Sequence, residues 1–190
     1  MKYKYIFLCS VIFVGCSFYS FKGSIPAHIN SVYISPIKNN TPESAVSDLI
    51  KTELQSSFIN ENILKLLSGD NSDSRLDLTV TLFTDRPYSY NIDEISSTGY
   101  EVVDRYRVDI KVKVKWHDIK NDILLFDQEF SGWASYDPQK DIGSDGIDND
   151  NDSFIDEKDD DEFGLPRESA IKIASRQISE SIINNIISTW

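Results

Sequence analysis

The chain has 190 residues, of which 40% are hydrophobic and 12% aromatic, and this length and composition are typical of one globular domain with a sizeable core. Acidic residues outnumber basic ones by 31 to 19, giving a formal net charge of −12, which argues against the clustered basic surface that nucleic acid requires. Both cysteines, Cys9 and Cys16, lie near the N-terminus, so no disulfide is expected within the folded domain.

The N-terminal segment has the pattern of an export signal. Lys2 and Lys4 form a positive region, and an apolar run that is too short to span a bilayer follows up to Val14. Gly15 directly before Cys16 resembles a bacterial lipobox, in which a lipoprotein signal peptidase cuts ahead of a cysteine that carries a diacylglyceryl thioether. Two acyl chains hold a protein on a membrane essentially permanently. The alternative is an ordinary secretory signal cut at another small residue, with Cys16 a free thiol.

These features divide the chain into three parts. We predict a lipoprotein signal peptide over residues 1–15, a lipidated leader over 16–28 and a single domain over 29–190. Inside the domain lies an acidic window, residues 141–162, which holds eleven acidic residues and one lysine. Most of the net negative charge is therefore a local feature of this insertion.

The first part of the domain predicts a strand, a helix and a short second strand. Residues 29–35 are mostly apolar, which predicts a buried strand. The stretch 41–60 has apolar residues at spacings of three and four, typical of an amphipathic helix, and Thr41 followed by Pro42 is a helix-start signal. Residues 63–67 are a short apolar run that predicts the next strand.

The middle of the domain predicts an antiparallel meander. Apolar and polar residues alternate with a period of two over 76–83 and, more clearly, over 105–116. Residues 87–99 read as an irregular polar connection between these two strands. A turn at 117–121 leads into a third strand up to residue 136, so the last two strands form a hairpin.

The chain closes with a second amphipathic helix, which begins at Pro166 and reaches Trp190. The element order is then βαβββα. Two apolar helix faces need one apolar sheet face, so the sequence predicts an α+β two-layer sandwich. In it, two helices pack on one face of a mostly antiparallel sheet of four to five strands.

The leader and both ends of the domain carry a recognisable pattern. A lipobox cysteine precedes the leader residues 19–26, Asn39-Asn40-Thr41 leads from the first strand into the first helix, and the closing helix ends at Trp190. This pattern resembles the LptE family of lipopolysaccharide-assembly lipoproteins. The resemblance implies a non-enzymatic, lipid-anchored protein in the outer membrane of a Gram-negative bacterium. It also implies that the protein sits inside an LptD β-barrel, helps the barrel to fold and assists delivery of lipopolysaccharide to the cell surface.

No catalytic constellation stands out in the sequence. It has two histidines and neither a glycine-rich phosphate loop nor a nucleophile elbow. His117 beside Asp118 at the end of a strand is more typical of a turn pair than of a catalytic dyad. We therefore expect no enzyme, and a lipid-anchored enzyme built from distant segments is the least favoured alternative.

Basic residues alternate along the strand predicted over 105–116, and we call them the basic stripe: Arg105, Arg107, Lys111, Lys113 and Lys115. One interpretation is the solvated face of an antiparallel sheet, where lysines also discourage edge pairing. The other is an electrostatic seat for the phosphates of lipopolysaccharide or for acidic groups in a barrel lumen.

The acidic window contains a calcium-loop-like motif. Oxygen ligands stand at the EF-hand positions of residues 148–159, namely Asp148, Asp150, Asp152, Phe154 through its carbonyl, Asp156 and Asp159. The segment also resembles thrombospondin type 3 repeats. Ser153 stands where the loop prefers glycine, and Asp159 where a longer glutamate would bind. The motif predicts Ca²⁺ as the sole cofactor and a calcium-dependent binding module as the alternative function, against a solvated acidic loop without metal.

Overall fold

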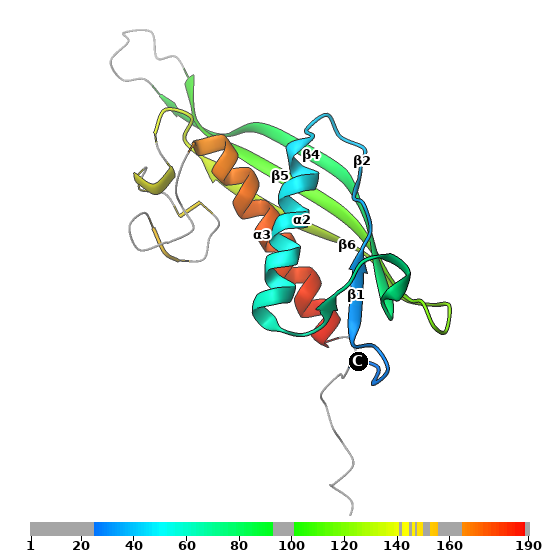
Figure 1. Ribbon diagram of the computed structural model, residues 1–190. Coiled ribbons are helices and arrows are strands. Elements are labelled where there is room, and N and C mark those ends of the chain that lie inside the picture. Colours follow the sequence, from blue (N-terminus) through cyan, green and yellow to red (C-terminus); the bar gives the residue numbers. More distant parts are fainter. Residues whose placement is uncertain are drawn as a thin grey trace, which may run out of the picture.

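The computed structural model describes residues 25–92, 101–140, 142–144, 146, 148, 149, 153–155 and 165–188. These residues form a sheet of six strands with two helices on one face (Figure 1). The strands are β1 (Ser31–Ile34), β2 (Lys38–Asn39), β3 (Lys65–Leu66), β4 (Ser74–Ile92), β5 (Glu101–Asp118) and β6 (Ile123–Tyr136), and the helices are α2 (Ala45–Glu61) and α3 (Pro166–Ser188). The predicted α+β two-layer sandwich is confirmed.

The strand order across the sheet is β3-β1-β4-β5-β6, with β2 pairing β4 beside β1. β4, β5 and β6 form a long antiparallel meander, as predicted. β1 is parallel to both of its neighbours, β3 and β4, and β2 is also parallel to β4. The strand that the sequence analysis missed is β2, because two polar residues carry no periodic signal.

The core lies between the helices and one face of the sheet. Alternate residues of β5, from Val108 to Trp116, are fully buried, whereas Lys111, Lys113 and Lys115 between them are exposed. The helix α2 buries Val46, Ile50, Leu54 and Phe58, and α3 buries an isoleucine stripe against the same face. The period-two pattern therefore sets which face of the sheet is left for solvent or a partner.

The β4 strand is longer than the sequence predicted. It continues through Pro87 to Ile92, so the expected irregular connection over 87–99 is wrong for its first six residues, and residues 93–100 lie outside the described part of the chain. The register against β5 shifts between Pro87 and Ser89 and again between Ser89 and Tyr90. Such bulges accommodate a proline, which cannot donate to the ladder.

The start of α2 also differs from the expectation. The helix begins at Ala45, and Thr41 does not cap it, because both its backbone N–H and its hydroxyl donate to Oδ1 of Asn39, at 2.9 and 2.7 Å. The side-chain amide of Asn39 in turn donates to the carbonyl of Glu43 at 2.8 Å. Asn39 therefore organises the connection between β2 and α2.

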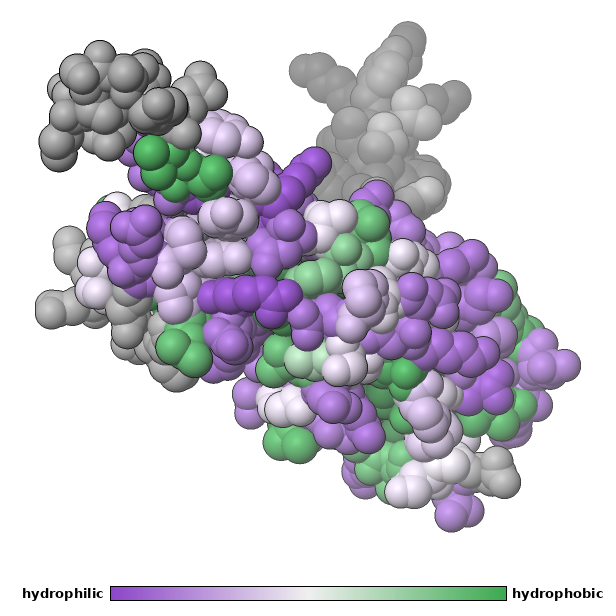
Figure 2. Space-filling view, turned by 90° about the horizontal axis from the view of Figure 1, so that it is seen from above, coloured by the Kyte–Doolittle hydropathy of each residue, from purple (hydrophilic) through white to green (hydrophobic). Residues whose placement is uncertain are grey.

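The two ends of the molecule carry different segments. The chain enters β1 at the same end as the turn between β5 and β6 and the C-terminal end of α3, whereas the described residues of the acidic window lie at the opposite end (Figure 1). Seen from above the view of Figure 1, the surface of the described residues is mainly hydrophilic, with hydrophobic residues in separate patches (Figure 2). Among the described residues, neither helix is long and apolar enough to cross a membrane.

Two carboxylates hold the start of the domain against the sheet, and we call this contact the leader root. Asp73 accepts hydrogen bonds from the backbone N–H of Asn30 and the hydroxyl of Ser31, at 2.9 and 2.7 Å. The carboxylate of Asp118, which is buried, lies 2.6 Å from Nε2 of His28. These bonds join the start of β1 and the residues before it to the residue that precedes β4 and to the end of β5.

The leader root should weaken in acid. The backbone N–H of Asn30 and the Ser31 hydroxyl lower the pKa of Asp73, and although burial acts to raise the pKa of Asp118, bonds from His28 and Asn121 outweigh it and lower that pKa too. A carboxyl whose folded-state pKa is depressed adds stability above its unfolded pKa, and this stability is lost as the pH falls below about 4 and through the lowered folded-state pKa. The urea midpoint of Asp73→Asn should therefore fall less steeply over this range than that of the wild type, and parallel curves would contradict the assignment.

Candidate functional site

The open face of the sheet carries a groove that gathers positive charge. It encloses about 730 Å³ between the β1–β2 connection and the strands β4 and β5. Its lining comprises Ser35, Pro36, Ile37, Lys38, Arg75, Asp77, Leu78, Thr79, Lys113, Lys115 and His117. We call this the basic groove, because its lysine and arginine side chains come from three different segments.

The chain path creates the groove. The backbone N–H of Ser35 donates to the carbonyl of Leu76 at 3.0 Å, and that of Asn40 donates to Val80 at 3.1 Å. Between these two bonds the chain from β1 to β2 passes through Pro36, which has no N–H to offer to β4. Lys38 follows at the start of β2 and stands on the rim of the groove.

A single carboxylate, Asp77, organises the floor of the groove. Its Oδ1 accepts a hydrogen bond from the hydroxyl of Ser35 at 2.6 Å, and its Oδ2 accepts one from Nε of Arg75 at 3.0 Å. Nε2 of His117 lies 3.7 Å from the same Oδ2. Asp77 thereby fixes the orientation of Arg75 and places the imidazole of His117 beside it.

The lysines of the groove are held only loosely. Nζ of Lys113 and of Lys115 lie 3.3 and 3.7 Å from the carboxylate of Asp127 on β6, and both lysine side chains are about half exposed. Exposed ion pairs of this kind contribute about 0–1 kcal/mol. Counting Asp77 and Asp127 against Lys38, Arg75, Lys113 and Lys115 leaves two net positive charges before any charge on His117. An incoming phosphate or carboxylate can therefore displace Asp127 from these lysines at low cost.

The rest of the basic stripe is engaged elsewhere. Nζ of Lys111 lies 3.2 Å from the carboxylate of Glu129. The guanidinium of Arg107 pairs with Asp109 at 2.8 Å and lies over the ring of Trp133, 4.2 Å from its centroid. The stripe therefore divides, and only Lys113 and Lys115 enter the groove.

Arg105 lies further along β5, with its Nε 3.6 Å from the Asp104 carboxylate.

Sequence reasoning missed Arg75 and Lys38 as partners of Lys113 and Lys115 in the basic groove. The available signal was that Arg75 and Asp77 occupy exposed positions of a period-two strand. Placing Asp77 opposite Lys115 needs the register between β4 and β5.

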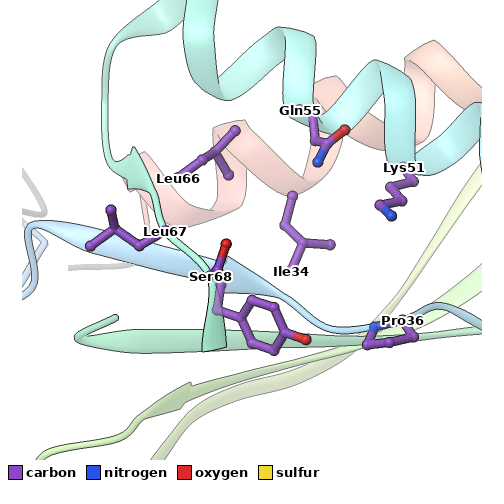
Figure 3. A pocket seen from close by; sticks show the side chains of 8 residues that line it. Ile34, Pro36, Lys51, Gln55, Leu66, Leu67 and Ser68 are labelled. Carbon is purple, nitrogen blue, oxygen red and sulfur yellow. The ribbon is translucent and has the colours of Figure 1, made fainter. Parts of the chain in front are cut away.

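A second, smaller hollow of about 280 Å³ lies between α2, β1 and β3. Lys51 and Gln55 extend from α2 above Ile34, and Leu66 and Leu67 close the other side (Figure 3). Lys51 is the one charged residue in its lining, so the hollow lacks the converging cations of the basic groove.

His117 and Asp118 do not form a dyad. Successive strand residues point to opposite faces, and accordingly His117 lines the basic groove while Asp118 bonds to His28 on the other side. Asp118 also accepts a hydrogen bond from the backbone N–H of Asn121 at 3.2 Å, which ties it to the following turn.

The described part of the acidic window shows one feature of a calcium loop. Oδ2 of Asp148, at position 1, accepts a hydrogen bond from the backbone N–H of Ser153, at position 6, over 3.0 Å. Ser153 has φ of 81°, a left-handed conformation of the kind that glycine supplies at this position. Phe154 is described as well, whereas Asp150, Asp152, Asp156 and Asp159 lie outside the described residues, as does Cys16.

The acidic window is docked on the sheet through Asn149. The backbone N–H of Ser135 on β6 donates to the carbonyl of Asn149 at 2.9 Å, and the side-chain amide of Asn149 donates to the carbonyl of Ser135 at 2.6 Å. Within the described ranges, no three His, Cys, Asp or Glu side chains gather into a metal-ion site.

Several solved structures match this chain at low sequence identity. A hypothetical protein from Chlamydia trachomatis is 10% identical with a TM-score of 0.48, covering 83% of this chain and 95% of that one. A protein from Xanthomonas campestris is 11% identical with a TM-score of 0.48, covering 87% and 91%. A minor lipoprotein from Acinetobacter baumannii is 9% identical with a TM-score of 0.44, covering 84% and 94%. At these values the likenesses carry no functional argument.

The family comparison covers nearly the whole domain. No curated protein matches the chain. The family model of LptE, described as lipopolysaccharide-assembly, matches residues 29–186, from before β1 to the last turns of α3. Among the described residues, the match thus includes every strand, α2 and all but the last two residues of α3, and the chain belongs to the LptE family.

Proposed function

We propose that this protein assists assembly of an LptD-like outer-membrane β-barrel and delivery of lipopolysaccharide to the outer membrane surface. The observation that carries the proposal is the match of the LptE family over residues 29–186. In this role the protein acts by binding and needs no catalytic group. Its partners are the barrel and lipopolysaccharide, and the membrane is engaged through a lipid anchor.

The anchor is part of this proposal. Cys16 follows Gly15 after an apolar run, and Ser17 stands next to it, which in many Gram-negative bacteria permits transfer to the outer membrane. Diacylation gives effectively permanent attachment where one chain would be marginal. The protein would therefore work at the outer membrane as a tethered domain.

The basic groove supplies a seat for the phosphates of lipopolysaccharide. Lys113 and Lys115 offer point charges whose present partner, Asp127, is partly solvated, and Arg75 offers a planar fork beside them. The same cations could meet acidic groups of a barrel lumen. We favour phosphate because cationic side chains from three segments line one hollow of about 730 Å³. A hollow of this size is suited to a headgroup.

Charge reversal tests the groove. In Lys113→Glu/Lys115→Glu, affinity for lipopolysaccharide should fall by about tenfold or more, since hydrogen bonds to charged groups contribute about 1.5–3 kcal/mol each. Binding can be measured by titration of purified protein at low and high salt, and the variant should also lose most of the salt dependence.

The matched control for this test is Lys51→Glu/Lys65→Glu, which makes the same charge change on exposed side chains outside the groove. Equal losses in both double variants would show a non-specific charge effect and remove the groove from the proposal.

For the barrel, depletion of the protein should lower the amount of folded barrel and of surface lipopolysaccharide. Normal levels of both would contradict the assembly role.

The calcium-dependent module is kept as a second candidate because Ser153 adopts the left-handed conformation that position 6 requires. We expect calorimetry to show weak binding, on the order of 10⁻⁴ to 10⁻³ M, because Asp159 is short and position 6 is not glycine. Ser153→Gly should bind several-fold more tightly, since a non-glycine residue in this region costs roughly 1–2 kcal/mol. Asp148→Ala/Asp150→Ala/Asp152→Ala is the control. An equal heat in that triple variant would show an acidic linker without a metal site.

A further inference from the structure

The turn between β5 and β6 exposes large apolar side chains, and we call residues 119–124 the hairpin tip. Ile119, Ile123 and Leu124 are 40%, 52% and 47% exposed. Lys120 and Asp122 in the same turn are also exposed, so the apolar side chains stand among one positive and one negative charge. Three exposed apolar side chains in one six-residue turn favour surroundings that accept both apolar groups and ions.

The hairpin tip is fixed to the place where the N-terminal segment enters the domain. The amide of Asn121 lies 3.2 Å from Nε2 of His28, which itself bonds to Asp118. The backbone N–H of Ile119 donates to the carbonyl of Asp73, a member of the leader root, at 3.0 Å. Cys16 precedes Ile25 by nine residues, a span of at most about 32 Å when fully extended. An acylated Cys16 therefore keeps this end of the domain close to the lipid surface.

The arrangement of the apolar side chains favours end-on insertion over docking on a flat protein surface. Ile123 stands opposite Asp118 and Leu124 opposite His117 in the ladder, so the two side chains leave the hairpin on opposite faces. A flat partner would cover one face only, whereas the interface of a bilayer surrounds an inserted tip. Lys120 has a long stem that can follow the apolar surface and place its ammonium among lipid phosphates.

We propose that the hairpin tip inserts Ile119, Ile123 and Leu124 into the surface of the membrane that holds the lipid anchor. The inference rests on the proposed anchor at Cys16. The tip and the acyl chains then give the domain two points of attachment, and the leader root holds the start of the tether beside the tip. The two attachments restrict how the basic groove can be oriented relative to the membrane.

Depth-dependent fluorescence quenching tests this contact on the full mature lipoprotein. Ile123→Cys carries a bimane label in vesicles of phosphatidylethanolamine and phosphatidylglycerol that contain nitroxide-labelled lipid. A tip in the interface lies about 5–10 Å deep, so a nitroxide near the headgroup should quench the label more than one near the end of the acyl chain. Gln128→Cys, exposed on the same strand but further from the tip, is the matched control and should stay unquenched. Ile119→Cys is a second reporter, in case the first label disturbs folding as seen by near-UV circular dichroism.

Flotation of the vesicles separates the two claims. If the protein floats with the vesicles and neither tip label is quenched, the membrane contact is wrong and the anchor stands. Equal quenching at the tip and at Gln128→Cys would also overturn the contact, since it would mean non-specific adsorption of the domain. Failure of the mature protein to float, with flotation no better than that of Cys16→Ser, would remove the anchor and this inference with it.

Discussion

Replacing Gly132 with alanine should lower the free energy of unfolding by about 3 kcal/mol. Gly132 lies on β6 where α3 crosses the sheet, and a Cβ built on it would stand 2.1 Å from the carbonyl oxygen of Ala174 and 3.1 Å from Cγ1 of Ile178. The first of these atoms belongs to the backbone of a helix, so it cannot rotate away as a side chain could. The helix must shift as a unit or the strand must bend, and either change disturbs packing along the interface.

Urea denaturation of the purified domain measures this loss. The urea midpoint of Gly132→Ala should fall while the slope of the transition stays the same, since this variant and the wild type expose similar surface on unfolding. Ser131→Ala, one residue earlier on β6 and exposed, is the matched control and should change stability by less than about 0.5 kcal/mol. An unchanged midpoint in Gly132→Ala would mean that α3 sits further from β6 than described above.

Replacing Arg167 with methionine should lower the free energy of unfolding by about 2 kcal/mol. Its Nη2 donates to Oε2 of Glu43 at 2.6 Å, and its Nε donates to Oδ2 of Asp85 at 2.8 Å. Asp85 also accepts from the hydroxyl of Tyr136 at 3.0 Å, and burial together with this bond raises the pKa of that hydroxyl. Removal of the guanidinium leaves two half-buried carboxylates near each other without a cation, and methionine preserves most of the side chain's apolar contact.

The control for this prediction is Arg86→Met, which removes an arginine that is 67% exposed and lies 3.5 Å from Asp109. Arg86→Met should change the free energy of unfolding by no more than about 1 kcal/mol, as for other exposed ion pairs. Thermal unfolding of both variants compares them directly. Similar losses in Arg167→Met and Arg86→Met would contradict a special role for the cluster at the start of α3.

The sequence was sufficient for most of the fold because periodicity is a local signal. The alternation over 105–116 predicts both a strand and its buried face, and the buried set from Val108 to Trp116 confirms it. The continuation of β4 beyond Pro87 was not predictable, because the register shift that accommodates this proline depends on a partner strand that the local pattern does not contain. Thr41 was predicted to start the helix, but its backbone N–H and its hydroxyl both donate to the side-chain oxygen of Asn39. The local sequence pattern does not show this competing acceptor.

The candidate site was only half predictable. Lys113 and Lys115 belong to the predicted stripe, but Lys38 and Arg75 join them through strand pairing across some 40 to 75 residues of chain, which no spacing rule encodes. The sequence likewise does not show that Arg107 lies over Trp133, which withdraws it from the stripe. The conformation of Ser153 was the reverse case: the residue that weakened the calcium motif adopts the backbone that the motif needs.

The position of β1 between β3 and β4 also has a mechanical consequence. Asn30 and Val32 accept hydrogen bonds from β3 on one side, and Ser35 donates to Leu76 of β4 on the other. Force transmitted along the leader from a lipid anchor would meet the leader root first and then β1, which is bonded on both sides and is not an edge strand. Drag on an anchored complex would therefore load several hydrogen bonds together before it reached the rest of the sheet.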